Sequence, residues 1–376
     1  MKSYKIFTIN PGSTSTKIAL FNDDELIFSQ NIMHSTEDLA IFSEINDQLD
    51  YRKEIILKVL KEKGQTLEGT DAFVGRGGGF KTVKSGVLAV NELMLKDAFD
   101  GFAGQHPCNL AVQLANEFVR EFGGVAYTVN PPVVDELQDL ARATGLKNIY
   151  RKSSIHALNQ KEVGIRYAHS QDKQYEDLNL VIAHLGGGIS VTAHKKGRMV
   201  DSSDNINGDG PMSPNRSGSI PALSVLRLAF SGDYTQKELE KLLTREAGWM
   251  DHIGITDGIE LANRIKQGDS YAKFVHDALV YQVAKNIGSY ATVLKGDVEA
   301  IILTGGLAYD TSLVEQLKEM TGYIAPVISM PGEYEMEALA AGALRIFRRE
   351  EEAQEYTGEA VWQGFDFEEA SLDGIN

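Results

Sequence analysis

The sequence predicts an α/β protein built from two related halves. Residues 4–32 and 178–203 each have the pattern strand, small-residue loop, strand, turn and strand, and they lie about half a chain apart, a spacing that indicates internal duplication. Helical patterns and further strands follow each segment, and alternating β and α elements are typical of sheets covered by helices. Two unrelated hairpins would be the alternative, but here the loop chemistry and the order of elements recur together.

The individual elements are predicted from hydrophobic period and turn residues. In the first half, strands are expected at 4–9, 17–21 and 26–32, with a polar loop over 10–16. In the second half, strands are expected at 178–183, 189–193 and 199–201, with a loop over 184–188. Apolar residues at the helical period predict helices at 50–63, 110–122 and 270–294. Further strands are expected at 125–129, 299–304 and 324–330.

Composition and charge exclude several classes of function. The 376 residues contain 37 Lys and Arg against 53 Asp and Glu, a net charge of −16. This balance argues against nucleic acid or an anionic membrane as partner, because both require clustered cations. No apolar run approaches the ~18 residues of a membrane span, and no signal-peptide pattern opens the chain. Cys108 is the only cysteine, so internal disulfides and thiolate metal cages are excluded. We expect a reduced, cytoplasmic protein.

The most informative stretch is residues 10–17, NPGSTSTK. Hydroxyls and backbone N–H groups in a tight turn between strands form an anion-binding concavity. Lys17 adds a point charge, and Asn10 offers an amide to a phosphate or to metal-bound water. A plain hairpin needs only two turn residues, so phosphate binding is favoured over a simple Ser/Thr-rich turn.

Glycines follow two later strands. The three glycines of residues 184–188, HLGGG, would let a phosphate approach the backbone closely, although a bulged hairpin is the alternative. Gly305 and Gly306 follow a buried strand and precede a helix, so a flat ligand could lie at that helix N-terminus; an ordinary βα loop competes with this interpretation. The sequence has no P-loop, no dinucleotide-binding glycine motif and no His-Glu-x-x-His motif.

Two arginines lie among small residues: Arg76 within 75–80, GRGGGF, and Arg216 within 215–219, NRSGS. An arginine on such a loop can bind a phosphoryl group with two hydrogen bonds, whereas a solvated arginine is the default for a single case. His106 and His156 would each be unremarkable in isolation. The alternating acidic residues at 333, 335 and 337 fit a solvated face, though one of them could address Mg²⁺.

Together these motifs resemble the sugar kinase/Hsp70/actin superfamily and, within it, the acetate and butyrate kinases. The matching motifs are at residues 10–17, 75–78, 106–107, 156, 183–188 and 215–218. Residues 133–137, 151–159 and 335–340 look most like the butyrate kinases. The resemblance implies two ribonuclease-H-like domains with an interdomain active-site cleft, the first spanning 1–153 plus 335–376 and the second 154–334 with the nucleotide-binding turn. It also implies a homo-oligomer built from dimers.

The resemblance implies that ATP and a short-chain carboxylate give ADP and an acyl phosphate, reversibly and with Mg²⁺. This reaction suits the residues present. A carboxylate with a pKa of ~4–5 is already ionised at pH 7 and needs no catalytic base, so positioning and charge neutralisation dominate. A sugar kinase of the same fold would instead need an Asp as base against a neutral hydroxyl. A chaperone-like ATPase would carry a partner-binding domain, and no composition shift marks one.

Each residue that matches a family motif inherits an implied role. Arg76 and Arg216 would clamp the two anionic reactants, and His156 would contact the phosphoryl group in flight. Nucleotide contacts are implied for Asn10, Ser13, Ser15, Lys17, His184, Gly186, Gly187, Gly188, Gly305 and Gly306. The carboxylate would lie near Arg76, Gly77, Gly78, His106 and Ile155. Asn10 and Glu337 would address Mg²⁺, with Glu335 as the register alternative.

Two departures from the family pattern concern catalysis and substrate length. The resemblance implies a catalytic Asp after the strand at 125–129, where this chain has Asn130. An amide cannot supply negative charge, so either Asp135 takes that role or the register of the match differs. Residues 77–79 are all glycine where acetate kinases are bulkier, which would leave room for extra methylenes, each worth about 0.8 kcal/mol. We therefore expect butyrate or a branched C4–C5 acid, with an acetate- or propionate-preferring kinase as the alternative.

The segment after Arg349 carries nine acidic residues and no Lys or Arg. Its aromatic residues argue against plain disorder; they are Tyr356, Trp362, Phe365 and Phe367. We expect a peripheral strand or arm.

Overall fold

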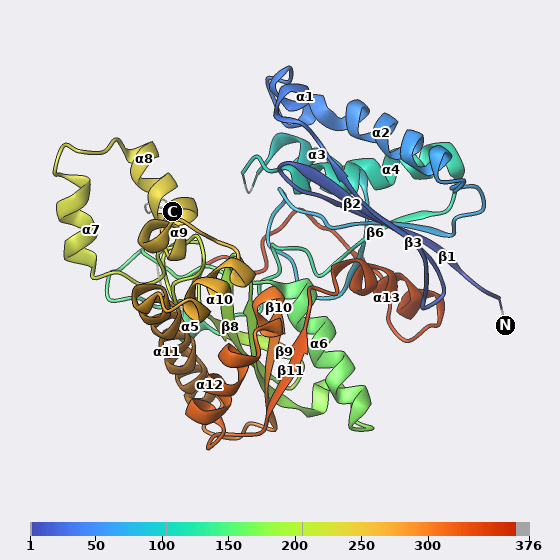
Figure 1. Ribbon diagram of the computed structural model, residues 1–376. Helices are drawn as coiled ribbons and strands as arrows, with labels where there is room; N and C mark the ends of the chain where they lie inside the picture. The colour runs from blue at the N-terminus through green and yellow to red at the C-terminus, as the bar shows by residue number, and fades with distance from the viewer. Residues whose placement is uncertain (1, 103, 205, 366–376) are drawn as a thin grey trace. The chain divides into compact units, whose positions relative to one another are not determined.

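The computed structural model describes residues 2–102, 104–204 and 206–365. These residues form two compact units. The first unit comprises residues 2–135 and 334–363, and the second comprises residues 136–333 with 364 and 365. Each unit is built on its own β-sheet, and Figure 1 labels the elements of both.

The first unit contains a seven-stranded mixed sheet of order β12-β5-β6-β4-β1-β2-β3. Strands β1, β2 and β3 form an antiparallel meander, and β4 and β6 continue the sheet parallel to β1. The strands are β1 (Lys5–Pro11), β2 (Ser15–Asn22), β3 (Glu25–Met33), β4 (Ala72–Gly75), β5 (Val87–Ala89), β6 (Val125–Val129) and β12 (Gln354–Glu355).

The second unit repeats this arrangement in a five-stranded sheet of order β11-β10-β7-β8-β9. Strands β7, β8 and β9 form the antiparallel meander, and β10 and β11 run parallel to β7. The strands are β7 (Asn179–Leu185), β8 (Ile189–Lys195), β9 (Arg198–Ser202), β10 (Ala300–Gly305) and β11 (Val327–Pro331). The order β9-β8-β7-β10-β11 matches β3-β2-β1-β4-β6 strand for strand, so the predicted duplication is confirmed.

Helices cover both faces of the first sheet (Figure 1). Apolar side chains of α2 and α4 form a core with one face of β1, β2 and β4, including Phe7, Phe73 and Phe118. Helix α13 contacts β1, β4 and β6 and lies on the opposite face (Figure 1). The helices are α1 (Thr36–Ala40), η1 (Asn46–Gln48), α2 (Leu49–Glu62), α3 (Glu92–Asp100), η2 (Pro107–Asn109), α4 (Leu110–Phe122) and α13 (Glu335–Phe347).

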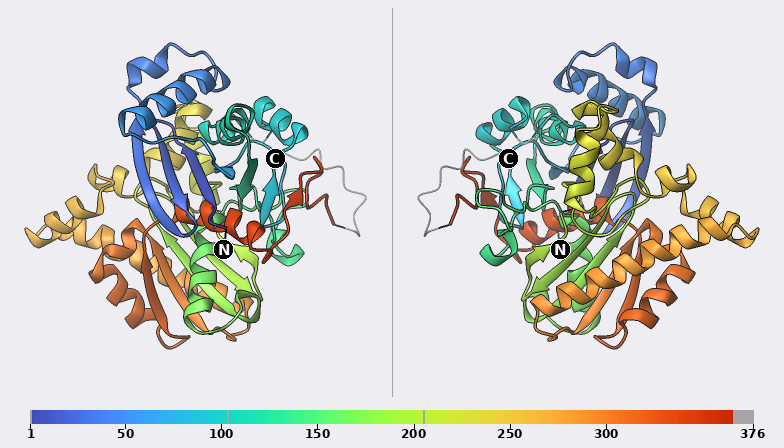
Figure 2. Two further views of the ribbon diagram at one scale, coloured as in Figure 1. Left: turned by 90° about the vertical axis from the view of Figure 1, so that its right-hand side faces the viewer. Right: turned by 90° about the vertical axis from the view of Figure 1, so that its left-hand side faces the viewer.

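The second sheet is also sandwiched between helices, as the views in Figure 2 show. Odd-numbered residues of β7 and β8 form a core with α11 and α12, whereas α6 contacts β7 and β10. Successive side chains of a strand point to opposite faces, so even-numbered residues face α6. The helices are α5 (Asp139–Arg142), α6 (Ala157–Ser170), η3 (Tyr175–Asp177), α7 (Ala222–Ala229), α8 (Gln236–Lys241), η4 (Leu242–Glu246), α9 (Trp249–Ile253), α10 (Gly258–Lys266), α11 (Ser270–Val293), η5 (Gly306–Tyr309) and α12 (Thr311–Thr321).

Helices α6 and α13 each cover the sheet of their own unit, although each follows a strand of the other unit's sheet in the chain. Helix α6 follows β6 in the chain but contacts β7 and β10. Helix α13 follows β11 but contacts β1 and β4. The segment before α6 also belongs to the second unit, although we expected residues up to 153 in the first domain: Gln138 N–H donates to Val200 O at 2.9 Å, and Arg151 pairs with Asp201. The expected 335–376 segment is split, since residue 364 begins a part assigned to the second unit, and 366–376 lie outside the described residues.

The predicted helices and strands all exist, with ends shifted by a few residues, but the two loops are shorter than predicted. β1 and β2 pair as far as Pro11 with Thr16, and β7 and β8 pair as far as Leu185 with Ile189. Each loop therefore contains only three residues, 12–14 and 186–188. Strand pairing extends further because the polar residues flanking each loop still complete the backbone ladder.

The acidic segment after Arg349 forms an edge of the first sheet. β12 pairs in parallel with β5, and the Tyr356 ring is buried against Phe80 with centroids 5.4 Å apart. The predicted peripheral strand is confirmed for these residues, while Phe367 lies outside the described residues.

Candidate active site

A buried arginine stabilises the β1–β2 loop through hydrogen bonds. Gly12 N–H donates to Ser15 O at 2.7 Å and closes the loop. Arg52 of α2 is fully buried and donates to Ser15 O at 3.1 Å and to Thr16 Oγ1 at 2.8 Å. Burial lowers the pKa of Arg52 to about 10, so the side chain keeps its charge at neutral pH. A cation beneath a loop of hydroxyls and backbone amides favours an anion on its outer side.

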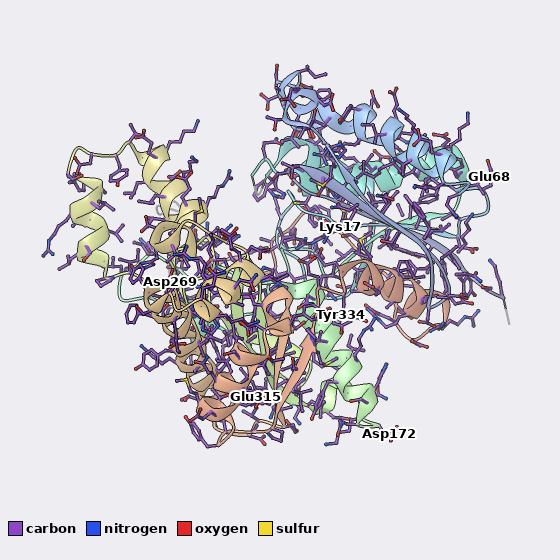
Figure 3. The ribbon with its side chains drawn as sticks, in the orientation of Figure 1. Lys17, Glu68, Asp172, Asp269, Glu315 and Tyr334 are labelled. Atoms are coloured by element: carbon purple, nitrogen blue, oxygen red, sulfur yellow. The ribbon has the colours of Figure 1, made fainter. Side chains whose placement is uncertain are left out.

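The side chains that could meet an anion lie along this loop. Ser13 is exposed and Ser15 half-buried, and Lys17, labelled in Figure 3, lies on β2 opposite Asn10. The sequence missed Arg52, because a charged residue in an amphipathic helix normally lies on the solvated face. No local pattern marks it as buried.

Arg76, Glu335 and Asn10 form one polar cluster in the first unit. Arg76 follows β4, and its Nη1 lies 2.8 Å from Glu335 Oε1 at the start of α13. Glu335 Oε2 accepts a hydrogen bond from Asn10 Nδ2 at 2.6 Å. Arg76 Nε is buried and has no hydrogen-bond partner among the residues that the structure describes, which leaves a donor that an anionic ligand would satisfy. Of the two acidic residues proposed for the metal, Glu335 is the one that makes these contacts.

The glycines after Arg76 are required by packing. A Cβ on Gly77 would lie 2.8 Å from Thr128 Oγ1, and one on Gly78 would lie 2.5 Å from Cys108 Sγ. Gly79 has φ +79°, and its Cβ would collide with Asn109. Protein atoms therefore occupy the volume that these residues lack. The expectation that the missing side chains leave room for extra methylenes is not supported, so substrate length must depend on other residues.

The other first-unit candidates have defined but separate environments. His106 is exposed, and its Nδ1 accepts a hydrogen bond from Cys108 N–H at 3.1 Å. Asp135 is buried, and its N–H donates to Val83 O at 2.9 Å. Asn130 has φ +40°, and its Oδ1 accepts from Gly86 N–H at 2.7 Å. Asn tolerates this left-handed backbone better than most residues, which gives Asn130 a structural reason for its identity.

In the second unit, the glycine loop seats Arg216. A Cβ on Gly188 would lie 2.7 Å from Arg216 Nη1, so the guanidinium rests directly on the loop backbone. Ser213 Oγ donates to Gly187 O at 2.5 Å and ties the two loops together. Burial lowers the pKa of Arg216. No atom of a described residue other than its chain neighbours lies within 4 Å of a Cβ on Gly187, so this residue leaves open space at the loop.

His156 and His184 stack at the same end of the second sheet. Their ring centroids lie 4.0 Å apart with an interplanar angle of 15°. His156 Nδ1 lies 2.8 Å from Ser190 Oγ, and His184 Nδ1 lies 2.7 Å from Asn159 Oδ1. Ile155, before His156, is buried. The structure thus brings both histidines and the glycine loop together at the carboxyl end of β7.

The second glycine turn has one structural and one open residue. Gly305 has φ +87°, and a Cβ there would collide with Leu185 O. Among residues 2–102, 104–204 and 206–365, chain neighbours apart, no atom lies within 4 Å of the Cβ position of Gly306. Gly305 therefore allows β10 to approach β7 closely, while Gly306, the first residue of η5, leaves room for a flat ligand.

The carboxylates present fit a magnesium ion that is shared with a phosphate ligand. Among residues 2–102, 104–204 and 206–365, no three His, Cys, Asp or Glu side chains gather into a group able to hold a metal. Mg²⁺ commonly takes one or two carboxylates and fills its other positions with water and substrate phosphates. Glu335 and Asn10 could supply such a partial site.

Within residues 2–102, 104–204 and 206–365, no helix combines the length and apolar character needed to cross a bilayer.

A duplicated α/β fold of this topology, with a short hairpin loop of small residues after the first strand of each half, defines the actin/Hsp70 fold class. The comparisons with solved structures support this class. The crystal structure of Porphyromonas gingivalis acetate kinase superposes with a TM-score of 0.75, covering 92% of this chain and 100% of that chain at 18% identity. A propionate kinase from Francisella tularensis gives 0.69, covering 90% and 98% at 19% identity. At these identities the likeness shows the fold.

Sequence comparison defines the family. Residues 134–322 match the acetokinase family. Butyrate kinase 2 of Clostridium acetobutylicum is 46% identical over 353 residues, which are 94% of this chain and 99% of that protein. Butyrate kinase 1 of the same organism is 44% identical with the same coverage. The chain therefore belongs to the acetokinase family and is a carboxylate kinase.

Proposed function

We propose that this protein transfers the γ-phosphoryl group of ATP to butyrate or a branched C4–C5 acid, reversibly and with Mg²⁺. The observation that carries the proposal is the similarity to two butyrate kinases over 94% of the chain. The sequence of polar groups in both units supports the same reaction class, since each unit presents cations and backbone amides to an anion.

Arg76 binds the substrate carboxylate. Its Nη1 pairs with Glu335 at 2.8 Å. Its buried Nε has no partner within the described part of the chain and can donate to an incoming oxygen. Planar guanidinium groups recognise carboxylates with fixed geometry. Because the carboxylate is already ionised, no residue has to remove a proton before attack.

Arg216 and His156 stabilise negative charge on the phosphoryl group. Phosphoryl transfer places negative charge on three equatorial oxygens, and catalysis consists mostly of positioning and electrostatic stabilisation. Arg216 packs against the glycine loop. His156 lies at the start of α6, where its Nδ1 is hydrogen-bonded to Ser190 Oγ. We infer that the transfer proceeds directly and in line, without a protein-bound intermediate.

The loops at 12–14 and 186–188 bind the nucleotide phosphates, assisted by Asn10, Lys17 and His184, and the Gly305–Gly306 turn borders the adenosine. Glu335 and Asn10 address Mg²⁺, with Glu337 as the register alternative. The metal ion supplies charge neutralisation between the phosphates when bound. Asp135 remains the candidate for the family's acidic position. A cytoplasmic location and a homo-oligomer built from dimers stay predictions.

The test is an acid panel. Purified protein is incubated with ATP, Mg²⁺ and linear or branched C2–C6 carboxylates, and acyl phosphate is trapped with hydroxylamine. The highest kcat/KM at C4–C5 supports the proposal. A maximum at acetate or propionate retains the family and refutes the butyrate assignment. ATP consumption without trapped product would favour a sugar-kinase-like ATPase.

A further inference from the structure

A chain of buried polar side chains lies between α6 and the sheet of the second unit and leads to His156. Ser190 and His194 project from β8 on the face toward α6, and Gln160 of α6 bonds both of them. Ser190, His194 and Gln160 are fully buried. Buried polar groups must satisfy their hydrogen bonds, so the direction of each bond can be worked out from its partners.

The orientation of the Gln160 amide is fixed by a backbone carbonyl. Gln160 Nε2 lies 3.1 Å from Ser190 O, and a carbonyl can only accept, so this atom is the NH₂ group. The same group donates to Ser190 Oγ at 2.8 Å. Gln160 Oε1 then faces His194 Nε2 at 3.0 Å, which must carry a proton.

The hydrogen bond between Tyr175 and His194 has the same direction as the one between His194 and Gln160. Burial lowers the pKa of His194 well below its usual value, so the ring is neutral with its proton on Nε2. His194 Nδ1 consequently accepts the Tyr175 hydroxyl, 2.5 Å away. Burial also raises the pKa of Tyr175, which keeps that hydroxyl protonated. The three hydrogen bonds therefore all run in the same direction. Tyr175 donates to His194, His194 donates to Gln160, and Gln160 donates to Ser190.

The Ser190 hydroxyl completes the chain at His156. The Ser190 oxygen already accepts a hydrogen bond from Gln160. Within the described residues, the acceptor that its hydroxyl proton meets is His156 Nδ1, at 2.8 Å. A hydroxyl without an acceptor would cost about 1–3 kcal/mol in this fully buried position. His156 Nδ1 therefore accepts, and the neutral ring carries its proton on Nε2.

The stacked partner, His184, has the opposite arrangement. Asn159 Nδ2 lies 3.2 Å from Gly332 O and 2.6 Å from Glu333 O, so this atom is the NH₂ group. Asn159 Oδ1 then faces His184 Nδ1 at 2.7 Å and can only accept. His184 therefore carries a proton on Nδ1, and its Nε2 has a lone pair in the neutral ring.

We propose that Ser190 and Gln160 hold His156 as a neutral Nε2–H donor, while Asn159 holds the stacked His184 in the opposite Nδ1–H form. The three are positioning residues, because they act through the two imidazoles. His156 then donates one hydrogen bond to a phosphoryl oxygen and transfers no proton. His184 accepts a hydrogen bond through Nε2 and can donate one to a phosphate only as imidazolium. These consequences for catalysis rest on the proposed function; the two tautomers do not.

The tautomers are measured directly by long-range ¹H–¹⁵N NMR on full-length protein labelled at its 8 histidines. His156→Gln and His184→Gln assign the two rings. We expect the Nε2–H pattern for His156 and the Nδ1–H pattern for His184 at pH 7.5. The same tautomer in both rings, or averaged signals, would overturn the inference whatever the enzyme's substrate. Absence of kinase activity with the expected tautomers would instead count against the proposed function alone.

The positioning role is tested with Ser190→Ala. Thr192→Val is the matched control, since Thr192 is buried on the same face of β8 and its hydroxyl pairs with Ser202 at 2.9 Å. We expect Ser190→Ala to lose the fixed His156 pattern and to lower kcat about 10–100-fold, with KM values within about twofold of the parent. The control should retain both. Equal losses of kcat in the two variants, or an unchanged His156 spectrum in Ser190→Ala, would refute the positioning role; if Ser190→Ala does not fold, the parent spectrum still decides the tautomers.

Discussion

The ion pair between Arg76 and Glu335 allows a sharp test of the anion site proposed for the first unit. Glu335→Gln keeps the side-chain shape but removes the charge. Both partners of this carboxylate are donors: Arg76 Nη1 at 2.8 Å and Asn10 Nδ2 at 2.6 Å. A glutamine has only one acceptor oxygen, so its NH₂ group must face one of these donors. One hydrogen bond is therefore lost, and a repulsive contact replaces it.

The magnitude follows from distance and burial. At 2.8 Å and an effective dielectric constant of ~20, the gross attraction is about 6 kcal/mol. Desolvation and partial exposure reduce the net contribution to about 1–3 kcal/mol, since the Arg76 and Glu335 side chains are 25% and 13% exposed. Activity should fall further than stability suggests, because a displacement of about 1 Å at a substrate-binding group costs about 100-fold in kcat/KM.

A second ion pair of the same unit is the control. Arg345 and Glu351 also lie 2.8 Å apart, at 19% and 26% exposure, and neither is a candidate site residue. Thermal unfolding should show similar losses for Glu335→Gln and Glu351→Gln. Acyl-phosphate formation should fall about 100-fold in the first variant and less than about threefold in the second. Equal activity losses, or an active Glu335→Gln enzyme, would refute the assignment of Arg76 to an anion site.

Three further outcomes depend on close contacts at glycines and on one buried histidine. Gly342→Ala in α13 would place a Cβ 2.5 Å from a buried valine, whereas a Cβ at Gly288 in α11 meets no described atom within 4 Å. In chemical denaturation, the free energy of unfolding of Gly342→Ala should be about 1–3 kcal/mol lower than that of Gly288→Ala. Equal stabilities would contradict the packing. Gly188→Ala should displace Arg216 and lower kcat about 10–100-fold with little change in Tm. An unchanged kcat would refute the close packing of Arg216 against Gly188. Burial disfavours the charged form of His276, but two flanking carboxylates outweigh burial and raise its pKa. The stabilisation by His276 is complete below the unfolded pKa of about 6.5 and is lost as pH rises through the higher folded pKa. The stability difference from His276→Gln should therefore shrink as the pH rises above about 6.5, and a constant difference would contradict this.

Local sequence patterns predicted the architecture because periodicity and turn residues are local properties. The meanders beginning at β1 and β7 were predicted from alternation, and α4 was predicted from its apolar period with the same limits that the structure shows. The loop lengths were wrong, since pairing depends on register between two strands rather than on residue type. The same limitation explains the glycines at 77–79: a sequence shows a missing side chain but not the neighbour that fills its space.

The candidate site was predicted only where chemistry is written in a contiguous motif. Arg76, Arg216 and the two hairpin loops belong to such motifs. Arg52 and Gln160 do not, because each becomes significant through a partner on a distant element, Ser15 for the first and Ser190 for the second. Such pairs depend on tertiary packing, which converts ordinary polar residues of amphipathic helices into buried positioning groups.

The position of α13 late in the chain has a consequence for synthesis. One face of the first sheet is covered by α13, which the ribosome makes only after residues 136–333 of the second unit. At roughly 5–20 residues per second, those 198 residues take about 10–40 s. During this interval the first sheet has an uncovered apolar face, and Arg76 lacks its carboxylate partner. The nascent chain thus exposes an apolar surface until α13 is made, and the proposed anion site around Arg76 cannot form before translation is nearly complete.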